Sequence, residues 1–252
     1  MQTHQTSSQL KSSAKGLLLG KYNLTIMATL LPEIIILLVA TIASTLVDDR
    51  SIVGMVISYT ISFILTLIGG IFTVGQLYIY MKIYCNTSTS ITEVFYGFKT
   101  HPDKAIIIKF IPLLLTVICI IPFGIMIALY MMTNSTIFML LSSIALILGG
   151  IVAVVIQLQF SQAFYLLLDF PDKEAKELLL MSRSLMNGHK GRLFYIYVSF
   201  LPLLLLAFFT FGFGFLFIIP YMTMTCTGFY FNLVQVKNTP IQQNLQSESL
   251  DA

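Results

Sequence analysis

The chain has 252 residues, of which 57% are apolar and only 10% are charged, whereas a soluble globular domain has about 25% charged residues. A domain of this size cannot hide so much apolar side chain from water, so the composition excludes an ordinary cytosolic fold and predicts that most of the chain lies in lipid. Fourteen bases against eleven acids give a net charge of +3, which is too small to indicate a nucleic-acid partner.

The first helix expected along the chain is short and amphipathic. Residues 1–9 are polar and are expected to form a disordered N-terminus. After them, apolar and basic residues fall on opposite sides of a helix, which is typical of a segment lying at a membrane interface. The apolar side has Leu10, Ala14, Leu17 and Leu18, and the basic side has Lys11 and Lys15.

Long apolar runs follow, and each is compared with the roughly 20 helical residues that cross about 30 Å of hydrocarbon. Four runs are long enough, at 23–46, 52–81, 105–132 and 137–168. The stretch 193–234 has no charged residue in 42 positions, and Gly212-Phe213-Gly214 interrupts it near its middle. We therefore predict an all-α, polytopic membrane protein with six transmembrane helices in one domain over 10–234, followed by a disordered tail over 235–252.

The bases indicate the orientation, because Lys and Arg are retained on the cytoplasmic side of inserting helices. With the N-terminus inside, every base except Arg50 lies in a cytoplasmic segment or close to one, which is thirteen of fourteen. Both termini are therefore expected in the cytoplasm, and the short connection around Asn134 outside.

A similar sequence motif recurs before each odd-numbered span, at intervals of about 80 to 90 residues. A glycine and a lysine come first, at Gly20-Lys21, Gly97-Phe98-Lys99 and Gly188-His189-Lys190, and a proline follows within the span, at Pro32, Pro112 and Pro202. Either this pattern is coincidental, or the chain contains three same-orientation hairpin repeats, about 10–84, 90–168 and 172–234. We favour the repeats, with helix kinks near the three prolines and near Pro220 and a turn at Gly212 and Gly214.

The third repeat begins with a second amphipathic segment, for which we expect a helix that starts near Pro171 and ends at Gly188. Ala175, Leu178, Leu179, Ser182 and Met186 share one face of it. The bases in and after the segment either bind anionic lipid headgroups or a cytoplasmic partner, or simply anchor the chain by the positive-inside rule. With the neighbouring histidine, these candidate residues are Lys173, Lys176, Arg183, His189, Lys190 and Arg192.

Glu33 is the one ionisable residue expected deep inside a span. A charged acid there costs about 2.5–3.5 kcal/mol on insertion scales, so it is expected to face the bundle interior or to be protonated. Gln76, Gln157 and Gln159 are its candidate polar partners. The site is either proton- or cation-linked, or a neutral acid with a structural role.

Small residues recur every four positions in the second expected span, at Gly54, Ser58, Ser62, Thr66 and Gly70. The fourth span has Ala145, Gly149 and Ala153. Such spacing lets helix backbones approach closely.

No catalytic constellation is recognisable. The sequence lacks HExxH, GxSxG, Walker and GxGxxG motifs, and its histidines and three cysteines have no metal-ligand spacing. We therefore expect no enzyme activity, no metal and no cofactor.

Several segments carry a family resemblance. Ser182–Lys190, Phe211-Gly212-Phe213-Gly214, Pro220-Tyr221 and Phe229-Tyr230 resemble the C-terminal signature of a Gram-positive bacterial membrane family catalogued as domain of unknown function 975. Ala14-Lys15 with Gly20 resembles its start, and residues 94–98 resemble its centre. The family usually has tryptophans near the Ser-Phe and Pro-Tyr pairs, whereas this chain has none. The resemblance implies a six-span protein of the bacterial cytoplasmic membrane and no particular reaction.

Two functions remain. The first is a non-catalytic membrane protein that binds lipids or partner proteins at the cytoplasmic interface, in envelope maintenance or protection. The second is a small transporter or channel with Glu33 in its path. The oligomeric state is left open by the sequence.

Overall fold

The computed structural model describes the backbone of residues 5–47 and 51–250 and the side chains of 5–47 and 51–235. Every regular element in these ranges is helical, which confirms the all-α prediction. The chain divides into two compact units, one formed by residues 1–102 with 191–252 and the other by residues 103–190.

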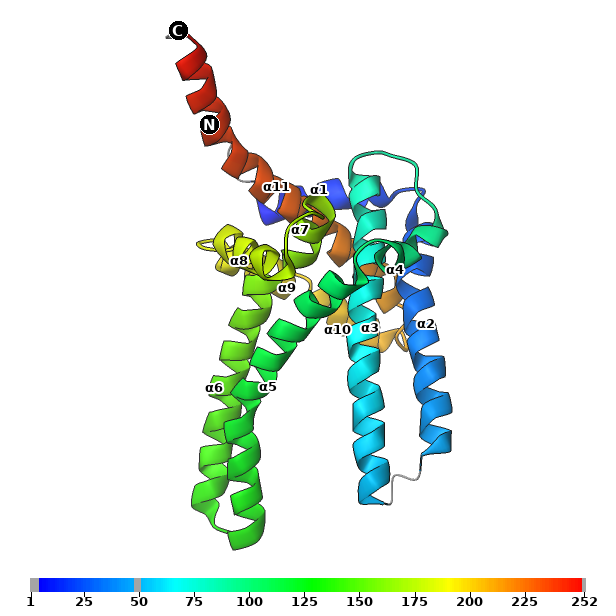
Figure 1. The fold of residues 1–252 in the computed structure, drawn as a ribbon, viewed down its shortest axis with the longest axis vertical. Helices are drawn as coiled ribbons and strands as arrows, with labels where there is room; N and C mark the ends of the chain where they lie inside the picture. Colours follow the sequence, from blue (N-terminus) through cyan, green and yellow to red (C-terminus); the bar gives the residue numbers. More distant parts are fainter. Residues whose placement is uncertain (1–4, 48–50, 251–252) are drawn as a thin grey trace. The chain divides into compact units, whose positions relative to one another are not determined.

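The first unit contains two long antiparallel helices and the segments that pack on them (Figure 1). Its elements are α1 (Ser7–Leu18), α2 (Tyr22–Leu46), α3 (Ile52–Tyr84), the 3₁₀ helix η1 (Ile91–Phe95), α4 (Tyr96–Lys99), α9 (Lys190–Val198), α10 (Leu201–Phe209) and α11 (Phe215–Leu250). Lys190, the first residue of α9, belongs to the second unit.

Helix α1 is the expected amphipathic segment. Thr6 caps it, because the Thr6 hydroxyl accepts from the backbone of Gln9 and the Gln9 side chain accepts from the backbone of Thr6. Leu10, Ala14 and Leu18 are buried, where α1 packs on α11 and α3. The helix begins at Ser7, inside the segment 1–9 that was expected to be disordered, because this capping box starts it earlier.

The segment η1–α4 lies directly against the backbone of α3. A Cβ atom placed on Gly75 would be 1.9 Å from the carbonyl oxygen of Val94, and one on Gly97 would be 2.3 Å from that of Ile71. The Lys82 ammonium donates to the Glu93 carboxylate at 2.7 Å, and the Thr89 hydroxyl also donates to Glu93. This segment is therefore fastened to α3 by close packing and by one ion pair.

The fifth expected span contains two helices, which are separated at Ser199 and Phe200, beside the proline where a kink was expected. Helix α9 ends at Val198, and Pro202 lies in the first turn of α10, where its missing N–H group costs no helical hydrogen bond. Pro32 and Pro112 lie inside the continuous helices α2 and α5 (Pro102–Thr133).

The turn predicted at 212–214 separates α10 from α11. Gly212 has φ +88°, and a Cβ on Gly214 would be 2.8 Å from Ala207 Cα, so both positions require glycine. Pro220 is buried in the second turn of α11. Helix α11 continues to Leu250, and the disordered tail expected over 235–252 stays a prediction.

The second unit is a helical hairpin with two short helices after it. Helices α5 and α6 (Thr136–Phe160) form the hairpin, and α7 (Ala163–Asp169) and α8 (Ala175–Leu185) follow (Figure 1). The expected fourth span 137–168 is interrupted at Ser161 and Gln162. Helix α8 begins at Ala175, later than the start expected near Pro171, and Asp169 is the last residue of α7.

Five helical segments in the described ranges are long and apolar enough to cross a membrane. They are Tyr22–Leu46, Ile52–Tyr84, Pro102–Thr133, Thr136–Asp169 and Lys190–Phe209. In the most apolar windows of α3 and α5 only 6% of the residues are buried. Apolar side chains exposed on this scale indicate a lipid bilayer environment. The sixth span, expected in the first part of α11, is not among the five and stays a prediction.

The glycines of the expected repeat behave alike at two positions and differently at the third. Gly20 and Gly188 adopt φ +76° and +78° after the amphipathic helices α1 and α8. Gly97 instead lies in α4, in close contact with α3. The threefold repeat stays a prediction.

Candidate functional site

Helix α8 presents its predicted apolar face to the protein. Ala175, Leu178, Leu179, Ser182 and Leu185 are buried, and Met186 is also fully buried. Because this face is fixed, the charged face of α8 points away from the core of the unit. Gly188 follows the end of the helix, as predicted, with a positive φ.

Ser182 fastens α8 to the break between α6 and α7. Its hydroxyl donates to the carbonyl of Gln159 at 2.9 Å and accepts from the backbone N–H of Gln162 at 3.3 Å. Ser182 is fully buried, so these two bonds are shielded from water. They fix the last turn of α8 beside the end of α6.

A cavity of about 400 Å³ lies between the end of α6 and the C-terminal part of α8, and it is mainly polar. Its lining residues are Gln159, Leu180, Arg183, Ser184, Asn187 and Lys190. Two cations, two amides and one hydroxyl thus surround one space, and no acid lines it.

The two cations of this cavity are held differently. Lys190 donates to the side-chain oxygen of Gln159 at 3.0 Å, so its ammonium is oriented by a neutral partner. Arg183 is exposed and makes no hydrogen bond or ion pair with any described residue. Its guanidinium can therefore bind a ligand without breaking a described contact.

The other predicted basic residues do not line this cavity. Lys173 pairs with Glu177 one turn along the chain, and Lys176 is exposed elsewhere on α8. His189 is partly buried and is not a lining residue.

Arg192 belongs to the first unit and has a structural environment. It donates to the carbonyl of Gln5 and, at 2.7 Å, to the side-chain oxygen of Asn232. Its guanidinium also lies 5.1 Å from the centre of the Phe229 ring. These contacts connect the N-terminal segment to α11, so Arg192 is not part of the headgroup candidate.

The predicted intramembrane polar site around Glu33 is not assembled within either unit. Glu33 is exposed on α2, whereas Gln76 donates to the backbone carbonyl of Ala28 at 3.3 Å. In the second unit, Gln157 donates to Thr116 at 3.2 Å, and Gln159 accepts from Lys190 as described above. Each of the three amides thus has another partner.

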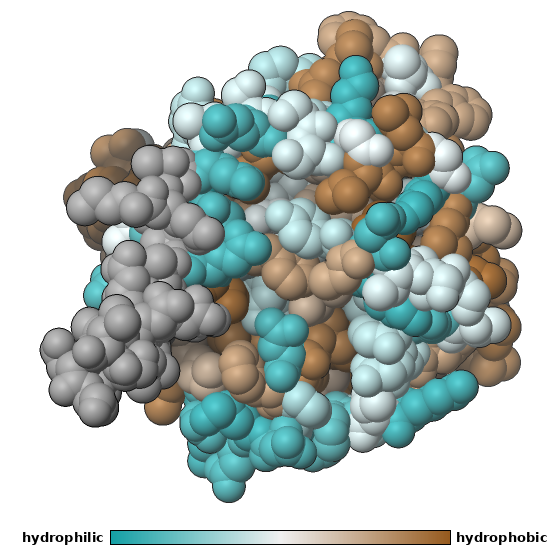
Figure 2. Space-filling model, turned by 90° about the horizontal axis from the view of Figure 1, so that it is seen from above, coloured by the Kyte–Doolittle hydropathy of each residue, from teal (hydrophilic) through white to brown (hydrophobic). Residues whose placement is uncertain are grey.

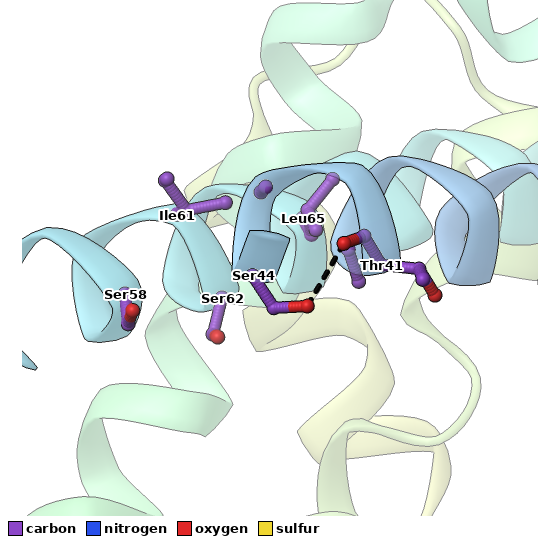
Figure 3. A pocket seen from close by; sticks show the side chains of 8 residues that line it. Thr41, Ser44, Ser58, Ile61, Ser62 and Leu65 are labelled. Atoms are coloured by element: carbon purple, nitrogen blue, oxygen red, sulfur yellow. Dashed lines mark hydrogen bonds between the residues drawn. The ribbon is translucent and has the colours of Figure 1, made fainter. Parts of the chain in front are cut away.

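A second hollow, of about 370 Å³, lies between α2 and α3. Ala40, Thr41, Ala43, Ser44, Ser58, Ile61, Ser62 and Leu65 line it, and Figure 3 shows the hydroxyl side chains of both helices around it. Ser44 donates to the carbonyl of Thr41 at 2.8 Å, and Thr41 donates to that of Leu37 at 2.8 Å. These two hydroxyls are thus satisfied by their own helix. The small residues predicted to allow close approach instead leave an open groove here.

Sequence reasoning missed the residues that complete the α8 cavity. Asn187 and Ser184 were noted only within the segment of family resemblance, and Gln159 was assigned to the Glu33 site. Their positions around Arg183 depend on the fold of α8 onto α6, for which the local sequence has no signal. The available hint was the set of polar residues that recur at helical spacing on the exposed face of α8. Figure 2 shows hydrophilic side chains spread among hydrophobic ones on the face seen from above.

The comparison with protein families gives one match, to the family described as "Protein of unknown function (DUF975)", over residues 1–237. The chain belongs to this family. That membership confirms the resemblance drawn from the sequence and assigns no reaction. No curated protein and no solved structure matches this member of the family.

Proposed function

We propose that this protein is a non-catalytic membrane protein that binds the headgroup of an anionic phospholipid in the α8 cavity, at the cytoplasmic face of the membrane. The carrying observation is that Arg183 and Lys190 line one space together with Asn187 and Ser184, with no acid in its lining.

The distribution of charge within the second unit supports a position of this site at the cytoplasmic surface of the membrane. Lys104 and Lys109 lie in the first turns of α5, and the remaining bases of the unit come after α6. All of them are therefore at the end of the hairpin opposite Asn134. Clusters of bases next to a span face the anionic cytoplasmic leaflet, where each contributes about 1 kcal/mol.

The chemistry of the lining suits a phosphodiester. A guanidinium donates through several N–H groups in one plane, which fits phosphate oxygens, and an ammonium supplies a point charge beside it. The Asn187 amide and the Ser184 hydroxyl can donate to the remaining oxygens or to a polar headgroup. The cavity volume of about 400 Å³ is sufficient for one headgroup.

The test is binding of phosphatidylglycerol and phosphatidylcholine to purified protein in non-ionic detergent, followed by native mass spectrometry. We expect wild type to prefer phosphatidylglycerol, and the R183Q/K190Q double variant to bind it about 30-fold more weakly, because two bases contribute about 2 kcal/mol. The matched control is K173Q/K176Q, which removes the same charge from the start of α8 and the residues just before it, outside the cavity. An equal loss of phosphatidylglycerol affinity in both double variants would mean that binding depends only on the total positive charge, and it would contradict a specific site.

We also propose six spans with both termini in the cytoplasm. The support is the asymmetry of the bases, together with a first part of α11 that has no charged residue before Lys237. The orientation puts α8 and its cavity on the cytoplasmic side.

A second candidate function is a small transporter that uses the groove between α2 and α3. The observation that favours it is the hydroxyl lining of this groove, together with Glu33, which lies eleven residues, or three helical turns, before Ser44 on the same side of α2. Proton flux into liposomes distinguishes the two candidates. A transporter predicts flux that Glu33→Gln abolishes, whereas a headgroup-binding protein predicts none from wild type.

A further inference from the structure

A second space in this unit lies between α5 and α6, farther from the C-terminal end of α6 than the α8 cavity. A groove of about 450 Å³ lies between the two helices, and its lining is almost entirely apolar. The helices touch at one edge of it, where a Cβ on Gly149 would be 2.6 Å from the carbonyl oxygen of Cys119. Helix α5 contributes Cys119, Pro122 and Met126, and the facing residues of α6 run from Leu141 to Val152. The groove lies within the second unit, as the α8 cavity does.

The cavity and the groove lie along one face of α6. Leu141, Ala145, Leu148 and Val152 line the groove, and Gln159 lines the cavity. These positions are separated by four, three, four and seven residues, a spacing that keeps side chains on one side of an α-helix. Val155 lies between them on the same face and is 42% exposed, so an apolar surface connects the two spaces.

The distances along the helix fit one lipid molecule. At 1.5 Å per residue, Val152 is about 10 Å and Ala145 about 21 Å from the level of Gln159. One leaflet of a bilayer has about 15 Å of hydrocarbon beneath about 5 Å of headgroup region, so a lipid whose phosphate is at the level of Gln159 has an acyl chain that passes Val152 and ends near Ala145. Leu180 adds an apolar wall to the polar cavity and is 63% exposed.

We infer that the second unit binds a whole anionic phospholipid, with its phosphate between Arg183 and Lys190 and one acyl chain along α6 in the α5–α6 groove. The positive cavity selects the charge of the ligand, and the groove selects its length. This inference rests on the proposed headgroup site and adds the acyl chain to it. The continuity of the two spaces on one helix face, with cations at one end only, favours a lipid over a helix of a second protein.

The experiment compares long and short ligands on the full chain. Dioleoylphosphatidylglycerol, dihexanoylphosphatidylglycerol and glycerol 3-phosphate are titrated into wild type and two variants in non-ionic detergent, with native mass spectrometry as the readout. Ala145→Phe puts a large side chain into the groove. The control, Ala128→Phe, makes the same change at an exposed position of α5 that does not line the groove.

We expect wild type to bind the dioleoyl lipid about tenfold more tightly than the dihexanoyl lipid, a ratio that equals about 1.4 kcal/mol. Ala145→Phe should remove this preference and leave binding of the dihexanoyl lipid unchanged, whereas Ala128→Phe should keep the preference. Thermal unfolding of each variant checks that it is folded, and the unchanged short-chain affinity makes the same check at the site.

Other results would overturn the inference, and they can be told apart. Equal chain-length preference in wild type and Ala145→Phe would leave the headgroup site without an acyl-chain groove. Binding of glycerol 3-phosphate as tight as that of the dioleoyl lipid would indicate a soluble anion as the ligand. A wild-type dimer that dissociates only in Ala145→Phe would place a second copy in the groove. Unchanged lipid binding in R183Q/K190Q would instead contradict the proposed headgroup site itself.

Discussion

Gly75→Ala tests how closely the segment η1–α4 packs on α3. Gly75 is the point where the two backbones meet, because an added Cβ would be 1.9 Å from the oxygen and 2.4 Å from the carbon of the Val94 carbonyl. Both atoms belong to the backbone, so no side-chain rotation can make room. The methyl group must therefore push η1 away from α3.

The magnitude follows from two opposing effects. Overpacking of a tight contact costs about 1–3 kcal/mol, whereas replacing glycine by alanine inside a helix gains about 1 kcal/mol. Gly69→Ala provides the matched control in the same helix, because its Cβ would be 3.6 Å from the Ile36 side chain, an ordinary contact. Both variants have the same helical gain, so Gly75→Ala is expected to be less stable than Gly69→Ala by about 2–3 kcal/mol, the upper part of the overpacking range.

The assay is unfolding of each purified variant by sodium dodecyl sulfate in mixed micelles, monitored by far-ultraviolet circular dichroism. The free energy of unfolding is compared between the two glycine variants, so that errors of extrapolation to zero denaturant affect both alike. Equal stabilities within about 0.5 kcal/mol, the usual size of a surface substitution, would refute the close approach of η1 to α3.

Three further predictions concern α8, the ion pair and the orientation. Ser182→Ala removes two buried hydrogen bonds, so we expect about 1–3 kcal/mol of destabilisation and weaker phosphatidylglycerol binding. If neither the stability nor the phosphatidylglycerol affinity falls, Ser182 does not position α8. Partial burial raises the pKa of Glu93, but its hydrogen bonds outweigh that effect and hold the pKa below the ordinary 4.5. Its contribution to stability is therefore complete above pH 4.5 and lost as the pH falls through the lowered pKa. Glu93→Gln should remove this acid dependence from the unfolding curve measured between pH 3 and 6, and an unchanged curve would refute the role of the Lys82 pair. In a variant without native cysteines, a membrane-impermeant thiol reagent on intact cells should label Asn134→Cys and spare Lys176→Cys, and the reverse pattern would invert the proposed topology.

The sequence predicted those parts of the fold that depend on local patterns. The spans around α2, α3 and α5 follow from the length of uncharged runs, and the buried faces of α1 and α8 follow from helical periodicity. Gly188 was recognisable as a helix end because a positive φ there suits glycine. Each of these features is determined by residues within a few turns of one another.

The features that the sequence did not indicate depend on distant partners or on position within a helix. The break between α6 and α7 is held by Ser182, twenty residues later in the chain, so no local pattern in 137–168 indicates it. Pro202 belongs to the same apparent motif as Pro32, but it begins a helix instead of lying inside one. A proline specifies a fixed φ and a missing donor, and the surrounding structure determines which of the two outcomes follows.

The basic residues show why a count of charges can indicate an orientation but cannot identify a binding site. Positive-inside retention depends on charge, which a lysine or arginine keeps when it donates to a neutral oxygen. Lys11 donates to the carbonyl of Ser199 and Lys104 to that of Pro171, and Arg192 binds Gln5 and Asn232, so part of the donor capacity of each serves the fold. Lys190 likewise uses one donor on Gln159, and an ammonium has two more. Ligand binding depends on donors that the fold has left over, and Arg183 has no described partner. The sequence gives the number of charges but not the number of remaining donors, because the partners come from residues far along the chain. The fold determines which remaining donors converge on one cavity, and those of Arg183 and Lys190 do so.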